Sequence, residues 1–208
     1  MIYLILGGAR SGKSTYAEAL AERLAGKGSS SQFAKQPGSV TYIATASAGD
    51  SEMRARIARH QSRRPKHWQL IEEQYQLSRQ LEKLTAAAGS KGDKTGDRTD
   101  PGSVILIDCL TLWLSNWLCR IDSGAAGRES GLSGLDSWNS EKNSFIEELK
   151  KSPVPIILVS NEVGSGIVPM GELSRHFVDH AGWLNQSVAR VADQVVLVVA
   201  GLPQTLKG

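Results

Sequence analysis

Apolar residues along the chain form short continuous runs separated by longer segments with helical composition. Such runs, free of alternation with polar residues, are typical of strands buried on both faces of a parallel sheet. We therefore predict an α/β fold of the phosphate-loop type described below, with a mostly parallel sheet and helices on both faces. The predicted strands are 2–6, 40–44, 104–108, 154–160 and 194–200, with a short candidate at 70–72. The predicted helices are 15–24, 50–63, 77–88, 110–118, 138–150 and 171–192.

Three segments lack this pattern and are rich in glycine and polar residues: about 27–39, 89–102 and 123–137. Their composition predicts flexible surface loops, because few of their side chains could contribute to a core. A chain of 208 residues is long enough for one sizeable α/β domain. We therefore expect residues 1–208 to form a single domain.

A glycine-rich segment directly follows the first apolar run and precedes the first predicted helix. Its spacing is that of a phosphate-binding loop, G-x-x-x-x-G-K-S/T. Glycines let backbone N–H groups point at phosphate oxygens, Lys13 supplies a positive charge for catalysis, and Ser14 can hold Mg²⁺. The alternative is a glycine-rich turn before an ordinary helix. The predicted nucleotide-binding residues here are Gly7, Gly8, Ala9, Arg10, Ser11, Gly12, Lys13 and Ser14.

A carboxylate ends the apolar run 104–108. In phosphate-loop enzymes an acidic residue at this kind of position holds Mg²⁺ beside the loop serine, so we predict that Asp108 binds the nucleotide through the metal. The alternative is that Asp108 caps the helix that follows. Ligands of parallel sheets bind at the carboxyl ends of the strands, where Gly7, Asp108 and Asn161 are expected.

Two tryptophans, Trp113 and Trp117, are spaced four residues apart in the apolar segment 110–118. This spacing puts both rings on one face of a helix. Packing in the core or at a subunit interface is favoured over a ligand platform.

Charge and cysteine content narrow the classes of ligand and compartment. The formal net charge of +3 is mild, and the nearest approach to a basic cluster is the arginine-rich segment 54–64, so we expect small anionic ligands and no nucleic acid. Cys109 and Cys119 have neither zinc-ligand spacing nor a disulfide framework. Without a charged leader or a run of membrane-spanning length, the sequence predicts a soluble cytoplasmic protein with no membrane span.

Blocks throughout the chain resemble one enzyme family, the bifunctional adenosylcobinamide kinase and adenosylcobinamide-phosphate guanylyltransferase family of cobalamin biosynthesis. The blocks are the phosphate loop, 42–46, the arginine-rich segment 50–68, 107–111, Asn-Glu-Val-Gly-Ser-Gly-Ile-Val-Pro at 161–169, 173–179 and 182–186. The resemblance implies phosphorylation of adenosylcobinamide with ATP or GTP, with Mg²⁺, followed by transfer of GMP from GTP to the phosphate to give adenosylcobinamide-GDP. It also implies a homotrimer.

The resemblance implies that a histidine after the second strand carries GMP covalently. His60 is the residue that fits the family pattern, and His67 is the competing histidine; His60 as an ordinary polar helical residue is the remaining alternative. A neutral imidazole is a nucleophile near pH 7, and its bond to phosphorus is labile. Arg63 and Arg64 could neutralise departing pyrophosphate, although a solvated helix end explains them almost equally well. By resemblance, the residues lining the nucleotide are Ala44, Thr45, Ala46, Gln61, Ser62, Arg63, Arg64 and Glu72.

Some roles stay open on sequence alone. Glu162 is either a base for the kinase step or a residue that shapes its own loop, and the sequence identifies no other base. The rival functions are a kinase without transferase activity and a GTP-binding switch. His60 in its arginine-flanked segment argues against a switch, which has no need of a nucleophile there.

Overall fold

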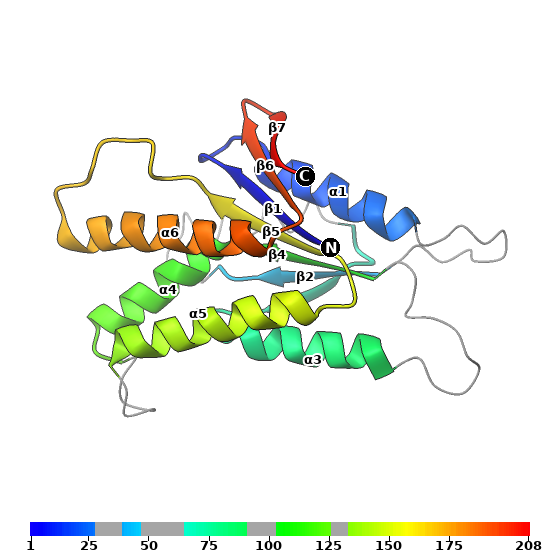
Figure 1. Cartoon of the computed structure of the whole chain (residues 1–208), viewed down its shortest axis with the longest axis horizontal. Coiled ribbons are helices and arrows are strands. Elements are labelled where there is room, and N and C mark those ends of the chain that lie inside the picture. Colours follow the sequence, from blue (N-terminus) through cyan, green and yellow to red (C-terminus); the bar gives the residue numbers. More distant parts are fainter. Residues whose placement is uncertain (28–38, 47–64, 91–102, 126–132) are drawn as a thin grey trace.

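The computed structural model describes residues 1–27, 39–46, 65–90, 103–125 and 133–208. Within these ranges the strands form one seven-stranded sheet in the order β3-β2-β4-β5-β1-β6-β7 (Figure 1). The strands from β3 to β6 in this order are parallel, and β7 pairs antiparallel with β6. The strands are β1 Ile2–Gly7, β2 Val40–Ala44, β3 Gln69–Glu72, β4 Val104–Asp108, β5 Ile156–Asn161, β6 Gln194–Val199 and β7 Leu202–Lys207.

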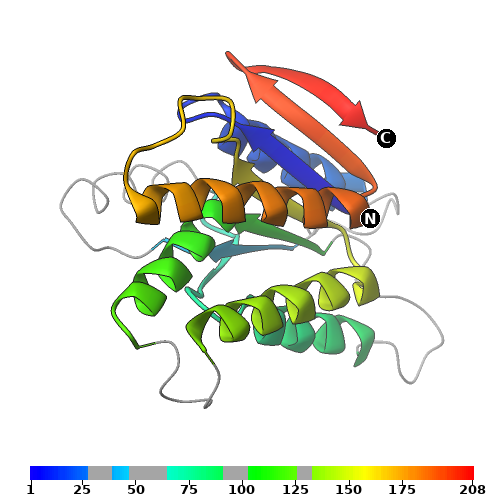
Figure 2. The ribbon, with the colours of Figure 1, turned by 60° about the vertical axis from the view of Figure 1, so that its left-hand side comes forward.

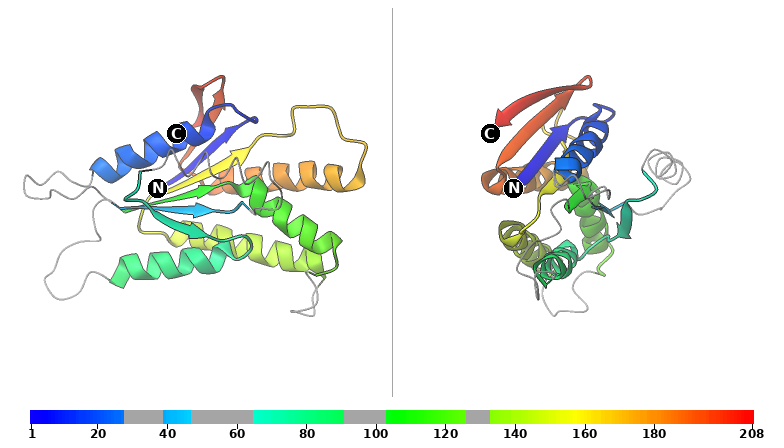
Figure 3. Two further views of the ribbon diagram at one scale, coloured as in Figure 1. Left: turned by 180° about the vertical axis from the view of Figure 1, so that it is seen from behind. Right: turned by 90° about the vertical axis from the view of Figure 1, so that its right-hand side faces the viewer.

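Helices cover both faces of the sheet, as Figure 3 shows from behind and from the side. One face packs against α1, and the other packs against α3, α4, α5 and α6. The predicted α/β fold with a mostly parallel sheet is therefore confirmed. The described helices are α1 Lys13–Lys27, α3 Leu77–Ser90, α4 Leu110–Asp122, α5 Gly134–Lys151 and α6 Glu172–Val191.

The two faces are filled by side chains of different size. On the face of α1, Ala17, Ala21 and Ala25 are buried, and these small side chains let the helix lie close to the strands. On the opposite face, the ring of Trp113 lies 4.8 Å from that of Trp138 and 4.9 Å from that of Phe145, measured between centroids. The larger core therefore holds α4 and α5 together.

The predicted loops and helices differ from the structure at several boundaries. The predicted loop 123–137 is wrong at its end, because α5 begins at Gly134, four residues before the predicted start of 138. Ser133 caps this helix by accepting a hydrogen bond from the N–H of Asp136, at 3.2 Å. The predicted loop 89–102 also begins too early, since Gly89 and Ser90 belong to α3. The predicted helix 50–63 lies entirely outside the described residues.

Strand β7 was not predicted. It forms a hairpin with β6 at the edge of the sheet and carries the C-terminus (Figure 2). All six of its residues are exposed, so they lack the buried apolar pattern that indicated the central strands. In the described ranges, no helix combines the length and the apolar character needed to cross a membrane.

Candidate nucleotide site

The phosphate loop joins β1 to α1. At two of its positions the backbone conformation or the close packing favours glycine. Gly12 has φ 94°, in the left-handed region that favours glycine. A Cβ on Gly7 would lie 2.5 Å from Ser11 Oγ and 2.6 Å from the Val198 carbonyl oxygen, too close for any side chain. Lys13 Nζ donates a hydrogen bond to the Gly8 carbonyl at 3.1 Å, so its ammonium group lies over the loop. The loop therefore has the curved, positively charged form that holds phosphate at a helix N-terminus.

The turn between β6 and β7 supports the phosphate loop from behind. Gly201 donates its N–H to the carbonyl oxygen of Ser11 at 2.8 Å. A Cβ on Gly12 would lie 3.2 Å from Gly201 Cα, so the two backbones are nearly in contact. Sequence reasoning missed this support. The only local sequence signal for this turn was Gly201, directly after the last predicted strand. In the structure its neighbour Ala200 has the unusual φ of 53°.

Asp108 lies at the carboxyl end of β4, on the same side of the sheet as the phosphate loop. The Tyr42 hydroxyl donates to its Oδ2 at 3.0 Å. The N-cap of α4 is Cys109, so Asp108 does not fill the capping position that was its alternative role. Burial raises the pKa of the Cys109 thiol to about 11, the Asp108 carboxylate adds to this rise, and the Lys13 ammonium opposes it. The Asp108 carboxylate and the Lys13 ammonium therefore have opposite effects on the same buried thiol.

The described donors suit a nucleotide-bound Mg²⁺ ion. Ser14, in the first turn of α1, and Asp108 are both half-buried, and each offers an oxygen. No cluster of three or more His, Cys, Asp or Glu side chains occurs in the described part of the chain. Mg²⁺ in such sites takes one or two protein ligands and completes its shell with phosphate oxygens and water, so one hydroxyl and one carboxylate fit it.

Four further predicted residues lie at the same edge of the sheet. Ala44 is the register partner of Glu72 on β3 and of Asp108 on β4. Thr45 and Ala46 follow β2, and the Thr45 side chain is fully buried, whereas Glu72 is exposed. The structure thus brings Ala44, Ala46 and Glu72 to one edge, while the Thr45 side chain points into the protein.

The predicted transferase residues are not all described. His60, Gln61, Ser62, Arg63 and Arg64 lie outside the described residues. The competing histidine, His67, is exposed just before β3. His176 and His180 belong to α6, in the part of the chain that follows β5.

The end of β5 forms a hydrogen-bonded link to the phosphate loop. Glu162 donates its backbone N–H to the Gly7 carbonyl at 3.1 Å. Its Oε1 accepts the N–H of Gly164 at 2.8 Å, which supports the interpretation that Glu162 shapes its own loop. Asn161 Nδ2 donates to Thr111 Oγ1 at 2.7 Å, and Asn185 Nδ2 donates to the Asn161 carbonyl at 3.1 Å. These polar contacts, which sequence reasoning missed, tie β5 to α4 and α6.

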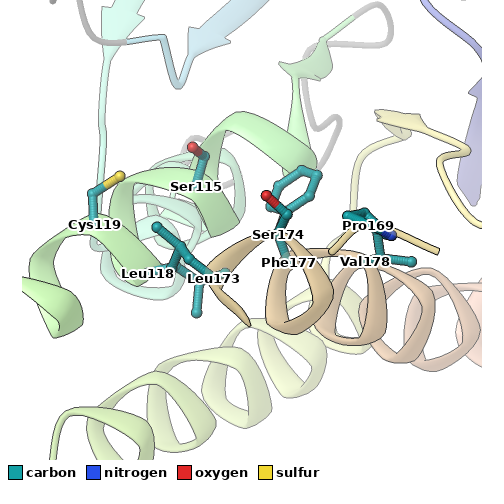
Figure 4. A pocket seen from close by; sticks show the side chains of 8 residues that line it. All are labelled: Ser115, Leu118, Cys119, Pro169, Leu173, Ser174, Phe177 and Val178. Carbon is teal, nitrogen blue, oxygen red and sulfur yellow. The ribbon is translucent and has the colours of Figure 1, made fainter. Parts of the chain in front are cut away.

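A pocket of about 260 Å³ lies between α4 and α6, apart from the phosphate loop (Figure 4). Leu118, Leu173 and Phe177 make its lining largely apolar, with Cys119 beside them.

The tryptophans of α4 do not line this pocket. Trp113 and Trp117 are buried, which confirms the prediction that they are structural, and both indole Nε1 atoms donate to the Tyr75 carbonyl, at 2.8 and 3.0 Å.

Comparison with solved structures supports the fold. The chain resembles a structure titled "Structural and biochemical analysis of a prototypical ATPase from the type III secretion system of pathogenic bacteria", with a TM-score of 0.51 and 12% identity. The match covers 98% of this chain and 56% of that chain, so this protein spans little more than half the length of the ATPase. At this identity the likeness concerns the fold alone.

Comparison with known sequences identifies the family. Relatives named bifunctional adenosylcobalamin biosynthesis protein match nearly the whole chain. CobP of Pseudomonas aeruginosa is 44% identical over 205 residues, covering 99% of this chain and 96% of the relative. CobU of Escherichia coli is 38% identical over 208 residues, covering both chains completely. Residues 3–206 match the family described as cobinamide kinase / cobinamide phosphate guanyltransferase. The chain therefore belongs to the cobinamide kinase and cobinamide phosphate guanyltransferase family, as its sequence motifs implied.

Proposed function

We propose that this protein phosphorylates adenosylcobinamide with ATP or GTP and then transfers GMP from GTP to the phosphate, giving adenosylcobinamide-GDP. The observation that carries the proposal is a phosphate loop at the same edge of the sheet as Asp108, in a chain that matches the kinase and guanyltransferase family over residues 3–206. The full length of the match supports both activities in one chain. We take residues 1–208 as a single catalytic domain.

In the kinase step, the phosphate loop binds the triphosphate through its backbone N–H groups. Lys13 places its charge where negative charge builds up on the transferred phosphoryl group. Ser14 and Asp108 would hold Mg²⁺, which would supply further positive charge at the same phosphates. The preformed loop, supported by Gly201, needs little rearrangement when charge develops, which is the main electrostatic advantage of such a site.

In the transferase step, the neutral imidazole of His60 attacks the α-phosphorus of GTP. A nitrogen–phosphorus bond forms as the bond from the α-phosphorus to the bridging oxygen breaks, and pyrophosphate leaves. A phosphate oxygen of adenosylcobinamide phosphate then attacks the same phosphorus, and the nitrogen–phosphorus bond breaks to restore the imidazole. Residues Ala44, Ala46, Gln61–Arg64 and Glu72 line the nucleotide in this proposal, whereas the side chain of Thr45, between the two alanines, is buried.

We also propose a cytoplasmic homotrimer. Both cysteines of the sequence are free thiols, which suits a reducing compartment such as the cytoplasm.

Exposed apolar side chains support the proposed trimer. The connection from β5 to α6 carries apolar side chains that are almost fully exposed, among them Ile167 at 98% and Met170 at 96%. Exposed apolar side chains that gather in one segment are typical of a surface that a partner covers. Sedimentation equilibrium tests the proposal, with three times the chain mass of 22.4 kDa expected.

Labelling with GTP tests the transferase assignment. The protein is incubated with Mg²⁺ and GTP labelled at the α-phosphate, denatured, and examined for acid-labile, base-stable label. Wild type and the control His67→Ala should be labelled, His60→Ala should not, and GTP labelled at the γ-phosphate should leave no such label. An unlabelled wild type, or a labelled His60→Ala variant, would overturn the covalent assignment to His60.

Kinase turnover on adenosylcobinamide tests the role of the phosphate loop. Lys13→Ala should lower turnover roughly 100-fold or more, because it removes a charge that acts on the transferred group. His60→Ala should keep kinase turnover. Unchanged turnover in Lys13→Ala would contradict the role of the loop, and normal kinase turnover in an unlabelled wild type would identify a kinase without transferase activity.

A further inference from the structure

Thr45 makes a set of buried contacts that the proposed chemistry does not use directly. It directly follows β2, and its side chain is fully buried. The hydroxyl donates to the Cys109 carbonyl at 2.7 Å and accepts the Cys109 N–H at 2.8 Å. The backbone N–H of Thr45 donates to the Asp108 carbonyl at 3.3 Å. Thr45 therefore binds both polar atoms of the peptide group that joins Asp108 to Cys109.

Asn116 on α4 holds Thr45 in turn. Its Nδ2 donates to the Thr45 carbonyl at 2.8 Å and to the Gln74 carbonyl at 3.3 Å. One amide group thus links the chain after β2 to the chain after β3. The two neighbouring indoles on the same face of α4 bind the Tyr75 carbonyl, so this part of the helix is itself firmly placed.

We propose that Thr45 is a positioning residue for the Asp108 carboxylate, and that Asn116 supports it. Tyr42 holds Oδ2 of the carboxylate, and Thr45 holds the peptide group that follows Asp108, so the side chain and the backbone of Asp108 have separate anchors. Mg²⁺ tolerates little departure from octahedral geometry, so a small shift of one ligand weakens its binding. This inference rests on the proposed role of Asp108 in the nucleotide site.

The chemistry of the site explains why threonine is needed. Valine has nearly the same shape and would suit a fully buried position better, yet it could neither accept the Cys109 N–H nor donate to the Cys109 carbonyl. The hydroxyl of Thr45 is occupied by these two bonds. Its contribution to the nucleotide site therefore passes through Asp108, whereas the sequence resemblance had placed Thr45 in the nucleotide lining itself.

Two substitutions separate the hydroxyl from the shape of the side chain. Thr45→Val removes the hydroxyl and keeps the volume, and Thr45→Ser keeps the hydroxyl. The readout is the affinity for a fluorescent GTP analogue with and without Mg²⁺, together with the Mg²⁺ concentration for half-maximal kinase turnover. We expect equal affinities without Mg²⁺, and a loss of about tenfold for Thr45→Val with Mg²⁺. Thr45→Ser should match wild type within about twofold, and Thr45→Val should need about tenfold more Mg²⁺.

A double-mutant cycle with Asp108→Asn tests the path of the effect. Asp108→Asn should lose the gain in affinity that Mg²⁺ gives, and adding Thr45→Val should lower affinity no further. If Thr45→Val weakens binding equally without Mg²⁺, or weakens Asp108→Asn further, Thr45 has only a packing role and the inference is wrong. If Asp108→Asn keeps the full Mg²⁺ effect, the proposed metal role of Asp108 fails, and the inference fails with it.

Asn116→Ala provides the second variant if Thr45→Val does not fold. It leaves the Thr45 hydroxyl in place and removes the support of the Thr45 carbonyl, so we expect the same Mg²⁺-dependent loss at about threefold. Ser115→Ala, on the neighbouring position of α4, is the matched control and should behave as wild type. An Asn116→Ala variant that folds and binds like wild type at every Mg²⁺ concentration would overturn the supporting role of Asn116.

Discussion

The phosphate loop and the connection from β5 to α6 lie at the same edge of the sheet but differ in how the chain supports them. We call residues 163–171 the arm; it projects beyond the sheet in Figures 1 and 2. The loop packs against its own chain, with Gly7 close to the Val198 carbonyl and Gly12 close to Gly201. The arm instead exposes Ile167, Val168 and Met170, at 98%, 70% and 96%.

The phosphate loop is thus held in shape by contacts within the folded chain, whereas the apolar side chains of the arm can be buried only by another molecule or another copy of the chain. A loop held by backbone contacts can offer N–H groups to phosphate without reorganising, which favours catalysis. Apolar side chains left in water contribute nothing to the stability of the folded chain. They stabilise a complex only when a partner or substrate buries them. Substitutions should therefore affect stability in the loop and association in the arm.

The largest expected effect is that of Gly7→Ala. Its Cβ would meet Ser11 Oγ and the Val198 carbonyl, so the loop or β6 must shift, at a cost of about 1–3 kcal/mol in the free energy of unfolding. Nucleotide affinity should fall with it. Urea denaturation and nucleotide titration measure both quantities. Gly8→Ala is the control: a Cβ there has no atom within 4 Å, so stability should change by less than about 0.5 kcal/mol. If Gly7→Ala and Gly8→Ala were equally stable, Gly7 would not be closely packed against Ser11 and Val198.

The two cysteines provide a chemical test of the same contrast. Cys109 directly follows Asp108 and is buried, with its pKa raised to about 11, chiefly by burial, whereas Cys119 is exposed near the start of α6. At pH 8 a thiol reagent should modify Cys119 at least about 100-fold faster than Cys109 in the native protein, because a buried thiol with so high a pKa forms little thiolate. Mass spectrometry of wild type and Cys119→Ser gives the two rates.

The pKa of Cys109 also predicts how stability depends on pH. Since the folded-state pKa exceeds the reference value of 9.0, the contribution of the thiol is complete below pH 9 and is lost as pH rises toward about 11. Cys109→Ala should reduce this alkaline loss of stability. Rapid modification of Cys109 at pH 8 in folded protein would contradict the burial on which both expectations depend.

The smallest expected change in stability comes from the arm. Ile167→Ser combined with Met170→Ser should alter the free energy of unfolding of the dissociated chain by less than about 0.5 kcal/mol, since both side chains are already in water. Sedimentation should nevertheless show weaker association. A large loss of stability in dilute, monomeric protein would mean that the arm is held by its own chain, and the contrast with the loop would disappear.

Local patterns were sufficient to predict the central parallel strands, because a strand covered on both faces is apolar along nearly its whole length. Strand β3 is parallel but mostly exposed, and its sequence indicated only the short candidate 70–72. Strand β7 escaped prediction because Leu202–Lys207 is exposed throughout and so has no such pattern. The start of α5 was missed for another reason. Its Ser133 cap and Gly134 lie in a glycine- and serine-rich stretch whose overall composition predicts a loop, and one local hydrogen bond to the Asp136 N–H outweighs that composition.

The candidate site shows the same limit. The phosphate loop is a contiguous motif, so its residues could be named from sequence. The contact of Thr45 with Cys109 joins residues 64 positions apart, and no local pattern reveals it. The support of Ser11 by Gly201 is more distant still, and it depends on the order of strands in the sheet. Such contacts belong to the tertiary fold, which the periodicity of a single segment does not encode.

The position of β1 in the sheet also determines when the site can come into being. Strand β1 is synthesised before its sheet neighbours β5 and β6, and before the turn that supports the loop. A growing chain therefore contains the phosphate motif before the strands and the turn that surround it in the folded protein have been made. Nucleotide can stabilise only chains that extend through this hairpin, so the ligand distinguishes them from chains truncated before it.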